Sequence, residues 1–461
     1  MKNIDIKLKT LMTVFLLVLS SCSFDEVIDP NNPSLQGVLS NASKAELQGL
    51  VTGLEARHRD YFDNATEMFG AFAREVVPFF ASDPRYTSDW LGDSGPTTYP
   101  DFFASAGTYL TPYVAVKQAN VLIASVANTN LLTAAEAAGY NGFAKTIKAY
   151  QMLFPLMQQY QNGIRINVED PLNPGPFVTY AEGLTAIRAL LDEAQTNLQS
   201  AGSSFSFTLK GFNPGPGTAD DFDTPAGFLK VNRAIAARAA LYAGDYAGAL
   251  TALQGSFLNL TPLSTLALNV GPVHVFGNSP DVSNPLFYVK DQPTNTILIV
   301  HPDIIEDMLP GDQRGSKFFQ RVNNPASNTG VPFPGNYQDN RWASNTTSIP
   351  FIRNEELILI YAEAQVFAAA GTNANAGTAI NVIRNLWGLA NYDVTGQSDD
   401  QILEQILFQR RYSLWAEGGH RWIDLRRTGK LDAAHVDLRD GGTIIPQVDR
   451  PTSETNWEEN N

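Results

Sequence analysis

Apolar residues recur at steps of three and four along residues 226–242, and no other feature of the sequence constrains the fold as strongly. In an α-helix this spacing puts the side chains on one face, which must then be buried. The face consists of Phe228, Val231, Ile235, Ala239 and Tyr242. Gly244 and Asp245 interrupt the pattern, and a second apolar repeat begins at Ala247. The sequence therefore predicts two adjacent helices that pack closely through small side chains.

Two further segments carry the same pattern. Residues 355–386 hold two apolar repeats separated by Gly371, and the repeat in residues 143–157 has a partner in residues 180–198. Pro155 lies inside the 143–157 repeat, so we expect a kink or a helix boundary there. Three helical pairs of this kind are typical of tetratricopeptide-like repeats. The predicted fold class is all-α, or mainly helical.

Long irregular stretches separate the helical pairs. They are rich in Gly, Pro, Asn and Asp and comprise residues 82–112, 203–225, 262–302 and 311–350. Within them, residues 296–300 and 273–276 are expected to form short strands. Loops this long in a compact protein usually carry function. We therefore expect long irregular loops that form a ligand site, with minor β elements.

The N-terminus predicts export and lipidation. Three lysines precede an apolar run over residues 11–19, which is too short for a membrane span of about 20 residues. Leu19-Ser-Ser-Cys22 matches the lipobox of bacterial lipoproteins, in which the cysteine thiol takes the lipid. Cys22 is the only cysteine, so the chain cannot form an intramolecular disulfide. We expect a signal peptide at 1–21, a lipidated tether at 22–35 and a single domain at 36–461.

Acidic residues follow the lipid-bearing cysteine in the tether. Asp25, Glu26 and Asp29 lie among prolines and asparagines, which predicts an extended polar segment. In lipoproteins of the Bacteroidetes such acids resemble a signal for export to the cell surface, and they are equally well explained as solvated linker charge. The expected location is the cell outer membrane, with the lipid-anchored protein facing the exterior.

The composition and scattered motifs exclude several functions. A net charge of -15 leaves no basic surface for nucleic acid. Gly92-Asp-Ser-Gly-Pro96 spells the serine loop of trypsin-like proteases, but that chemistry needs a histidine base and a fold of two β-barrels. The five histidines lack ligand spacing, and the acids of the loop Asp220-Asp221-Phe-Asp223 lack the terminal glutamate of a calcium loop. We therefore predict no catalytic residue, no metal site and no cofactor.

Charged residues near the C-terminus are expected to form structural pairs. Glu417, Arg421 and Asp424 are spaced by four and by three, which would put them on one helical face. Acids and arginines in this arrangement brace a fold far more often than they catalyse. We therefore expect these three residues to pair with one another. The same structural interpretation applies to Arg353, Glu363 and Arg384.

The last hundred residues carry a series of motifs in a recognisable order. They are Arg353 to Ala364, Ala379 to Arg384 with Gly388-Leu389, and Gln409-Arg-Arg-Tyr-Ser-Leu-Trp-Ala-Glu-Gly-Gly-His-Arg-Trp-Ile-Asp-Leu-Arg-Arg427, preceded by Gly311-Asp-Gln-Arg314. In these motifs the chain resembles the SusD/RagB family. Where many relatives have a Tyr-Gly-Asp-Val-Pro turn, this sequence has Tyr160-Gln-Asn-Gly-Ile-Arg165, so the ligand class cannot be carried over.

The resemblance implies a function. Members of the family are nutrient-binding outer-membrane lipoproteins with four tetratricopeptide-like units, loops that form a ligand site, and a SusC-like TonB-dependent transporter as partner. They catalyse no reaction. The implied function is a surface-exposed lipoprotein that captures an oligosaccharide or peptide and delivers it to the transporter. The alternatives are a glycoside hydrolase lipoprotein that uses two carboxylates, and a structural or adhesive repeat lipoprotein.

Aromatic residues in the loops are the candidates for ligand contact. A flat ring can stack on the apolar face of a sugar or on a peptide side chain while its polar group stays hydrated. Tyr86, Trp90 and Tyr99 form one predicted cluster, and Tyr337 and Trp342 form the second. Packing of the loops onto the helices would explain each ring equally well.

Overall fold

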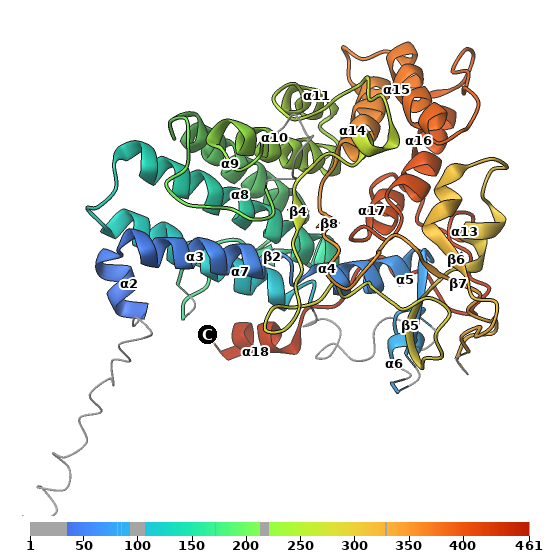
Figure 1. Ribbon diagram of the computed structural model, residues 1–461, viewed down its shortest axis with the longest axis horizontal. Helices are drawn as coiled ribbons and strands as arrows, with labels where there is room; N and C mark the ends of the chain where they lie inside the picture. The colour runs from blue at the N-terminus through green and yellow to red at the C-terminus, as the bar shows by residue number, and fades with distance from the viewer. Residues whose placement is uncertain are drawn as a thin grey trace, which may run out of the picture.

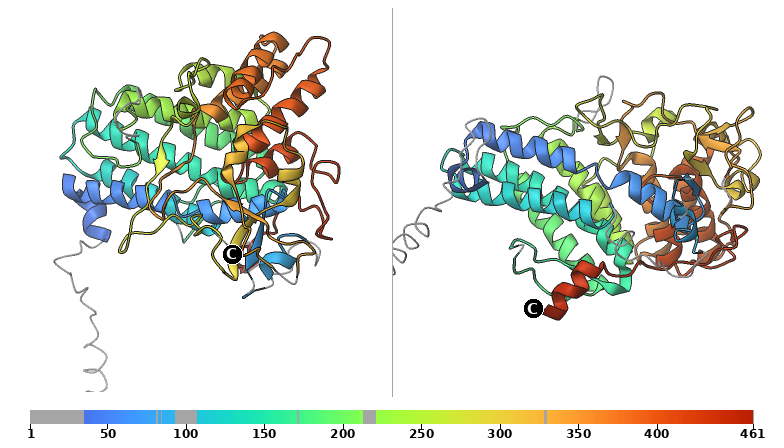
Figure 2. Two further views of the ribbon diagram at one scale, coloured as in Figure 1. Left: turned by 45° about the vertical axis from the view of Figure 1, so that its right-hand side comes forward. Right: turned by 90° about the horizontal axis from the view of Figure 1, so that it is seen from below.

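The computed structural model describes residues 35–80, 82–83, 85–92, 107–170, 172–212, 221–327 and 330–460 (Figure 1). A stack of helices forms one side of the molecule, and each helix packs on the next in chain order (Figure 2). The stack consists of α3 (Lys44–Arg57), α7 (Leu110–Asn128), α8 (Ala134–Gln159), α9 (Tyr180–Gln199), α10 (Pro225–Tyr242) and α11 (Tyr246–Gln254). The short α2 (Leu35–Asn41) packs on α7. Cys22 and the predicted signal peptide lie outside the described residues.

A second group of helices, orange and red in Figure 1, extends from the end of this stack. Its members are α14 (Asn354–Phe367), α15 (Asn373–Leu386), α16 (Asp399–Ser413) and α17 (His420–Arg427). Helix α14 joins the two groups because it contacts α10 and α11 as well as α15 and α16. The last helix, α18 (Thr452–Asn460), lies apart from α17, where Glu454 forms a 2.9 Å ion pair with Arg165.

The three predicted helical pairs are confirmed as α8 with α9, α10 with α11, and α14 with α15. Asp245 begins α11 by accepting a 2.8 Å hydrogen bond from the backbone N–H of Gly248. Gly371 lies in the turn between α14 and α15, as its position in the pattern predicts. The mainly helical class, with tetratricopeptide-like pairs and minor β elements, is therefore correct.

Two glycines allow α8 and α9 to approach each other closely. A Cβ at Gly142 would lie 2.6 Å from Cγ of Leu198, and a Cβ at Gly183 would lie 2.9 Å from Cδ1 of Leu156. The helix boundary considered at Pro155 is wrong, because α8 continues to Gln159. A proline inside a helix removes one backbone hydrogen bond, and the complete burial of residues 149–159 offsets that loss.

A four-stranded antiparallel sheet gathers segments from both halves of the chain. Its strand order is β1-β5-β7-β6. The strands are β1 (Val76–Phe80), β5 (Thr296–Val300), β6 (Phe318–Gln320) and β7 (Tyr337–Asp339). The strand predicted at residues 296–300 is β5, which is buried between β1 and β7.

Two small ribbons and several short turns complete the fold. The ribbons are β2 (Ile164–Arg165) with β3 (Phe177–Val178), and β4 (Val273–His274) with β8 (Ile349–Pro350). The predicted strand at 273–276 is thus shorter than expected. The remaining elements are α4 (Phe62–Asn64), η1 (Ala65–Phe69), α5 (Gly70–Phe72), α6 (Arg85–Ser88), η3 (Tyr160–Asn162), α12 (Thr265–Leu268), α13 (Pro302–Glu306) and η4 (Gln313–Lys317).

One large hydrophobic core runs from the helix stack to the four-stranded sheet, and a smaller core lies between α14, α15 and α16. Ile358, Ile380 and Ile402 are completely buried in the smaller core. Since both cores are continuous with α14, the sheet and the loops around it have a firm helical base. None of the helices in the described part of the chain is long and apolar enough to cross a membrane.

Candidate functional site

A π-helical turn, η1, lies between α4 and α5 and next to the sheet. Such a turn widens a helix by one residue and frequently occurs at functional sites. Thr66 in this turn is buried, and its hydroxyl accepts a 3.2 Å hydrogen bond from the backbone N–H of Gly418. The neighbouring Glu67 is only half-buried. In this turn the side chain of Thr66 is therefore hydrogen-bonded to the C-terminal motif, while the side chain of Glu67 remains partly accessible.

The C-terminal motif braces the segment from η1 to β1. The ring of Trp422 lies 4.8 Å from the ring of Phe69, the last residue of η1. The indole N–H of Trp415 donates a 3.0 Å hydrogen bond to the backbone carbonyl of Glu75, just before β1. These contacts explain why a motif in the last hundred residues determines the geometry of a site that is built from residues near the start of the domain.

Two tyrosines from distant segments interact electrostatically with Glu67 of η1 and with Asp63 of the preceding α4. Tyr86 belongs to α6, and Tyr288 lies in the loop before β5. Burial raises the pKa of each hydroxyl, and Glu67 and Asp63 raise it further by repulsion. Both rings are half-buried and keep part of their surface exposed. The fold thus assembles an aromatic and acidic surface, Asp63–Glu67–Tyr86–Tyr288, which we call the tyrosine surface.

Glu67 has an unusual acidity within the tyrosine surface. Burial, followed by repulsion from Asp63, raises the pKa of Glu67 to about 8. Burial also raises the pKa of Asp63. At neutral pH Glu67 is therefore largely protonated and can donate a hydrogen bond as well as accept one. Rings flanked by such groups can hold a ligand that has both an apolar face and hydroxyl groups.

The second predicted cluster lies on the same sheet. Tyr337 in β7 is half-buried, and β7 is joined through β5 to β1. Trp342 is 9% exposed. The guanidinium carbon of Arg341 lies 4.7 Å from the ring centroid of Trp342 and 4.8 Å from that of Trp415. Trp342 therefore forms one side of a cation–π stack, and Tyr337 is the ring of this cluster with more accessible surface.

Trp90 lies behind Tyr86. Their ring centroids are 4.9 Å apart with the rings edge to face, and Trp90 is completely buried. Ligand contact by Trp90 and Trp342 stays a prediction, and their burial favours the packing role that the sequence left open. Tyr99 lies outside the described residues. Tyr86 and Tyr337 are the predicted ligand residues that keep accessible rings.

The C-terminal carboxylates form ion pairs, but the predicted partners are wrong. Nε of Arg353 lies 2.9 Å from Glu417, and Nε of Arg410 lies 2.5 Å from Asp424. Although burial opposes ionisation, Arg353 holds the pKa of Glu417 below its usual value, and Arg410 is the main cause that lowers the pKa of Asp424 to about 2. Glu417 does not share a face with Arg421 because α17 begins only at His420, after two glycines with φ of 83°.

The other predicted structural residues have different kinds of partners. Glu363 forms an ion pair with Arg427, and Arg353 bonds to Glu355 in addition to Glu417. Arg384 donates a 2.7 Å hydrogen bond to the backbone carbonyl of Ala390 and forms no ion pair with an acid among the described residues.

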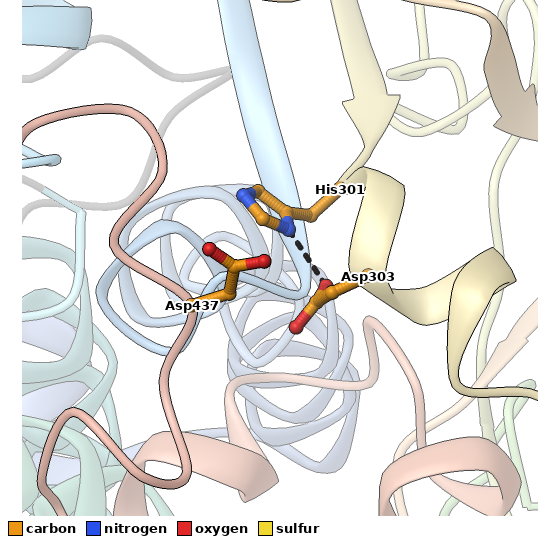
Figure 3. Close-up of side chains that lie close together, drawn as sticks. All are labelled: His301, Asp303 and Asp437. Atoms are coloured by element: carbon orange, nitrogen blue, oxygen red, sulfur yellow. Dashed lines mark hydrogen bonds and ion pairs between the residues drawn. The ribbon is translucent and has the colours of Figure 1, made fainter.

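Three potential metal ligands meet outside the tyrosine surface (Figure 3). One ligand atom from each of His301, Asp303 and Asp437 lies within 4.8 Å of the others. The Nδ1 of His301 is 2.6 Å from Asp303, whose other oxygen accepts a 2.5 Å hydrogen bond from Arg411. Arg439 donates to Asp437 at 2.6 Å. Because arginines already neutralise both carboxylates, we interpret the cluster as an ion-pair network.

The described residues provide no evidence that the protease-like motif or the calcium-like loop forms a functional site. Of Gly92-Asp-Ser-Gly-Pro96 only Gly92 is described. The upstream His58 is buried, and its Nδ1 lies 2.7 Å from the amide nitrogen of Gln151. Asp220 lies outside the described residues, and Asp221 is exposed.

Sequence reasoning missed Glu67, Asp63 and Tyr288. Tyr288 lies in the irregular stretch 262–302, where function is expected, so its aromatic ring in a loop is the signal that could identify it. Glu67 gives a weaker signal, a single acid between Thr66 and Met68 in an apolar stretch. Its role depends on the π turn and on burial by distant residues, and neither has a pattern in the local sequence.

Comparison with known proteins agrees with this architecture. Residues 315–461 match the model of the SusD family. Among curated proteins, none matches the chain in sequence.

Solved structures share the fold over most of the chain. Surface glycan-binding protein A from Bacteroides thetaiotaomicron, in complex with laminarihexaose, superposes with a TM-score of 0.68 at 14% identity over 90% of this chain and 98% of its own. A SusD-like carbohydrate-binding protein from Bacteroides vulgatus has a TM-score of 0.60 at 17% identity, covering 84% and 83%. NanU of B. fragilis has a TM-score of 0.60 at 16% identity, covering 91% and 94%.

Proposed function

Because the chain belongs to the SusD family, we propose that it binds an oligosaccharide at the cell surface and delivers it to a TonB-dependent outer-membrane transporter. The single observation that carries the choice of site is the tyrosine surface, where two half-buried rings interact electrostatically with Glu67, whose pKa burial raises to about 8. The glycan named for one structural neighbour supports a carbohydrate as the ligand. A peptide is the other ligand class that the binding experiment must include.

Each component of the tyrosine surface has a distinct role in this proposal. The rings of Tyr86 and Tyr288 stack on the apolar faces of sugar units. Glu67 donates a hydrogen bond to a sugar hydroxyl, and Asp63 accepts one. The ring of Tyr337, on the same sheet, extends the contact along the ligand. Trp90 packs against the ring of Tyr86, and Trp342 stacks on the guanidinium of Arg341.

The proposed function includes no catalysis. This can be tested, because Asp63 and Glu67 are the two carboxyl groups of the tyrosine surface that a glycosidase could use. A glycosidase uses one protonated and one ionised carboxyl group on either side of the scissile bond. Since Glu67 has a raised pKa and Asp63 lies four residues before it, this pair is the feature of the tyrosine surface that a hydrolase would need. A binding protein leaves the glycan intact, so the binding experiment must also analyse the products.

The test uses the mature lipoprotein in detergent and a panel of neutral oligosaccharides that includes laminarihexaose. Isothermal titration should show saturable binding to at least one glycan, with no shorter product detectable by chromatography. Tyr86→Ala should weaken that binding about tenfold, since stacking and hydrogen bonds at one residue contribute on the order of 1–2 kcal/mol. Tyr246→Ala, a half-buried tyrosine on α11, is the matched control. Binding to peptides alone, or release of sugar, would contradict the proposal.

Delivery needs a separate experiment. Extraction of native membranes with mild detergent, followed by affinity purification through this lipoprotein, should co-purify a barrel-sized transporter. A lipoprotein that is recovered alone at native abundance would refute delivery, whereas the titration would still decide the ligand. Recovery of a different partner would instead support the structural or adhesive alternative.

A further inference from the structure

A cavity of about 330 Å³ lies beside α16, apart from the tyrosine surface. Gln405, Phe408 and Arg411 of α16 line it, together with Tyr392 from the preceding loop and Arg421 of α17. Its size suits a small solute up to a monosaccharide. Two guanidinium groups in one small cavity are an unusual combination, because like charges repel strongly where water is limited.

Arg421 is a buried cation without an ion-pair partner in the described part of the chain. It is 8% exposed, and its Nη2 donates a long 3.3 Å hydrogen bond to the backbone carbonyl of His435. Its Nε meets no acceptor among the described residues. A buried charge is costly unless it is paired, so the structure leaves a donor and a positive charge available at this cavity.

The acids nearest to Arg421 in sequence form ion pairs with other arginines. Glu417 pairs with Arg353, and Asp424 pairs with Arg410 and Arg427. Glu75, just before β1, attracts Arg421, but burial outweighs that attraction and raises the pKa of Glu75 to about 8. At neutral pH Glu75 is therefore mostly uncharged and neutralises little of the positive charge.

Arg411 adds a second guanidinium whose position is fixed. Asp303 and Asp307 accept hydrogen bonds from it at 2.5 and 2.8 Å, and His301 holds Asp303 in turn (Figure 3). Burial and then repulsion from Arg411 lower the pKa of Arg421 to about 10. Arg421 thus stays charged at neutral pH, and it lies near Arg411, whose guanidinium is held in place by Asp303 and Asp307.

The remaining polar groups favour an anion over a cation. The amide nitrogen of Gln405 is buried and has no acceptor among the described residues. Glu404 also lines the cavity, but Lys430 and His435 bind its carboxylate at 2.6 and 3.2 Å. The cavity therefore offers donors from Arg421 and Gln405, with the rings of Phe408 and Tyr392 as less polar walls.

From this arrangement we propose that the cavity binds an oxyanion, a carboxylate or sulfate group carried by a solute no larger than a monosaccharide. Arg421 and Gln405 donate hydrogen bonds to the anion, and Arg411 adds attraction. A planar carboxylate matches the fork of a guanidinium group better than a spherical ion does. The solute is either a free small anion or an acidic sugar, and both present the same group.

The test titrates the mature lipoprotein with four probes at constant ionic strength: acetate, sulfate, glucuronate and glucose. Calorimetry and the melting temperature report binding, with chloride as the reference salt. At least one anion should bind and glucose should not. Stronger binding of glucuronate than of acetate identifies an acidic sugar as the ligand, and equal binding identifies a free anion. Absence of binding by all three anions overturns the proposal.

Two glutamines one helical turn apart provide a matched pair of variants. Both Gln405 and Gln409 have buried amide nitrogens without an acceptor among the described residues, but only Gln405 lines the cavity. Gln405→Met should weaken anion binding about tenfold, the effect of one hydrogen bond to a charged group. Gln409→Met should leave binding unchanged. Equal effects of the two variants would contradict the assignment.

Arg421→Lys is the second variant, since it keeps the positive charge and removes the planar fork. We expect a folded protein whose anion affinity falls at least tenfold, and unchanged affinity would overturn the proposal. The inference does not rest on the proposed glycan function. Each variant is therefore also titrated with the neutral glycan that binds at the tyrosine surface, whose affinity should not change, so failure at one site remains distinguishable from failure at the other.

Discussion

A Cβ atom at Gly419 would lie only 2.2 Å from the Cβ of Phe69. Gly419 directly precedes α17 in the strongest C-terminal motif, and Phe69 ends the π turn that carries Glu67. The backbone of the motif therefore touches the segment that builds the tyrosine surface, with no room for a side chain between them. This contact is the physical reason for a glycine at this position.

Gly419→Ala should destabilise the protein by roughly 2–5 kcal/mol, because it combines overpacking against Phe69 with a φ of 83° that disfavours alanine. Gly418→Ala is the control, since Gly418 has the same φ but open space around its Cβ position, and it should cost only about 1–2 kcal/mol. Urea unfolding measures both values. Equal losses for the two variants would show that the contact with Phe69 contributes little.

Trp90→Ala should act mainly through stability. The ring is completely buried beside Tyr86, and removal of a buried tryptophan costs about 3–5 kcal/mol. Trp90→Phe, which keeps an aromatic ring in contact with Tyr86, should retain glycan affinity within about twofold. The experiment compares unfolding free energy and glycan affinity for each variant. If Trp90→Phe lost affinity at unchanged stability, Trp90 would contact the ligand directly.

Stability should fall as the pH rises from about 6.5 to 8, above the range in which the buried His58, His274 and His420 act in the opposite direction. Burial raises the pKa of both Glu67 and Glu75 to about 8 in the folded protein, against a usual value of 4.5. In that window the folded state holds protons that the unfolded state has released, so each group lowers the unfolding free energy by at most about 1.4 kcal/mol per pH unit.

Glu75→Gln tests this pH dependence, because the side chain stays neutral at every pH. Denaturation at pH 6.5 and pH 8 should show a smaller loss of stability for this variant than for the natural protein. Glu306→Gln is the control, since Arg439 lowers the pKa of that exposed glutamate and its contribution has the opposite sign. An unchanged pH dependence in Glu75→Gln would mean that Glu75 is ionised in the folded state.

Cys22→Ala should release a folded protein that binds its ligands but no longer supports uptake. The described domain contains no cysteine, and its cores are formed by residues far from position 22 in sequence. The melting temperature and glycan affinity of the variant should equal those of the natural protein, while it should appear in the soluble fraction. Loss of folding would contradict a purely anchoring function of Cys22.

The helical part of the fold follows from short-range patterns. The stripe through Phe228, Val231 and Ile235 predicts α10 correctly because residues three and four apart share a face whatever surrounds them. The strand β5 was also predictable from a short run of apolar, mostly β-branched residues, and four of its five residues are buried. The strand β1 escaped prediction, because Val76–Phe80 lies among helices and acquires its pairing partner only from β5.

The candidate site was less predictable than the fold. A loop tyrosine such as Tyr86 can be recognised by its type, but its exposure depends on Trp90 behind it. The acidity of Glu67 depends on burial by residues that are remote in sequence. Arg421 has no ion-pair partner among the described residues because Arg353 and Arg410 pair with the acids expected to pair with it. Each of these properties depends on which distant residues contact the side chain in the folded protein, and the spacing of residues in the sequence does not determine those contacts.

The pairing of Val76 in β1 with Val300 in β5 also affects the order of assembly. As the chain is made from its N-terminus, the helices of the stack can form as soon as each pair is complete, because their contacts are local. β1 has no sheet partner until β5 exists, and the π turn has no brace until the C-terminal motif follows. A chain interrupted before the C-terminal motif would thus form the helical stack without a complete tyrosine surface, so ligand binding requires that synthesis has passed this motif.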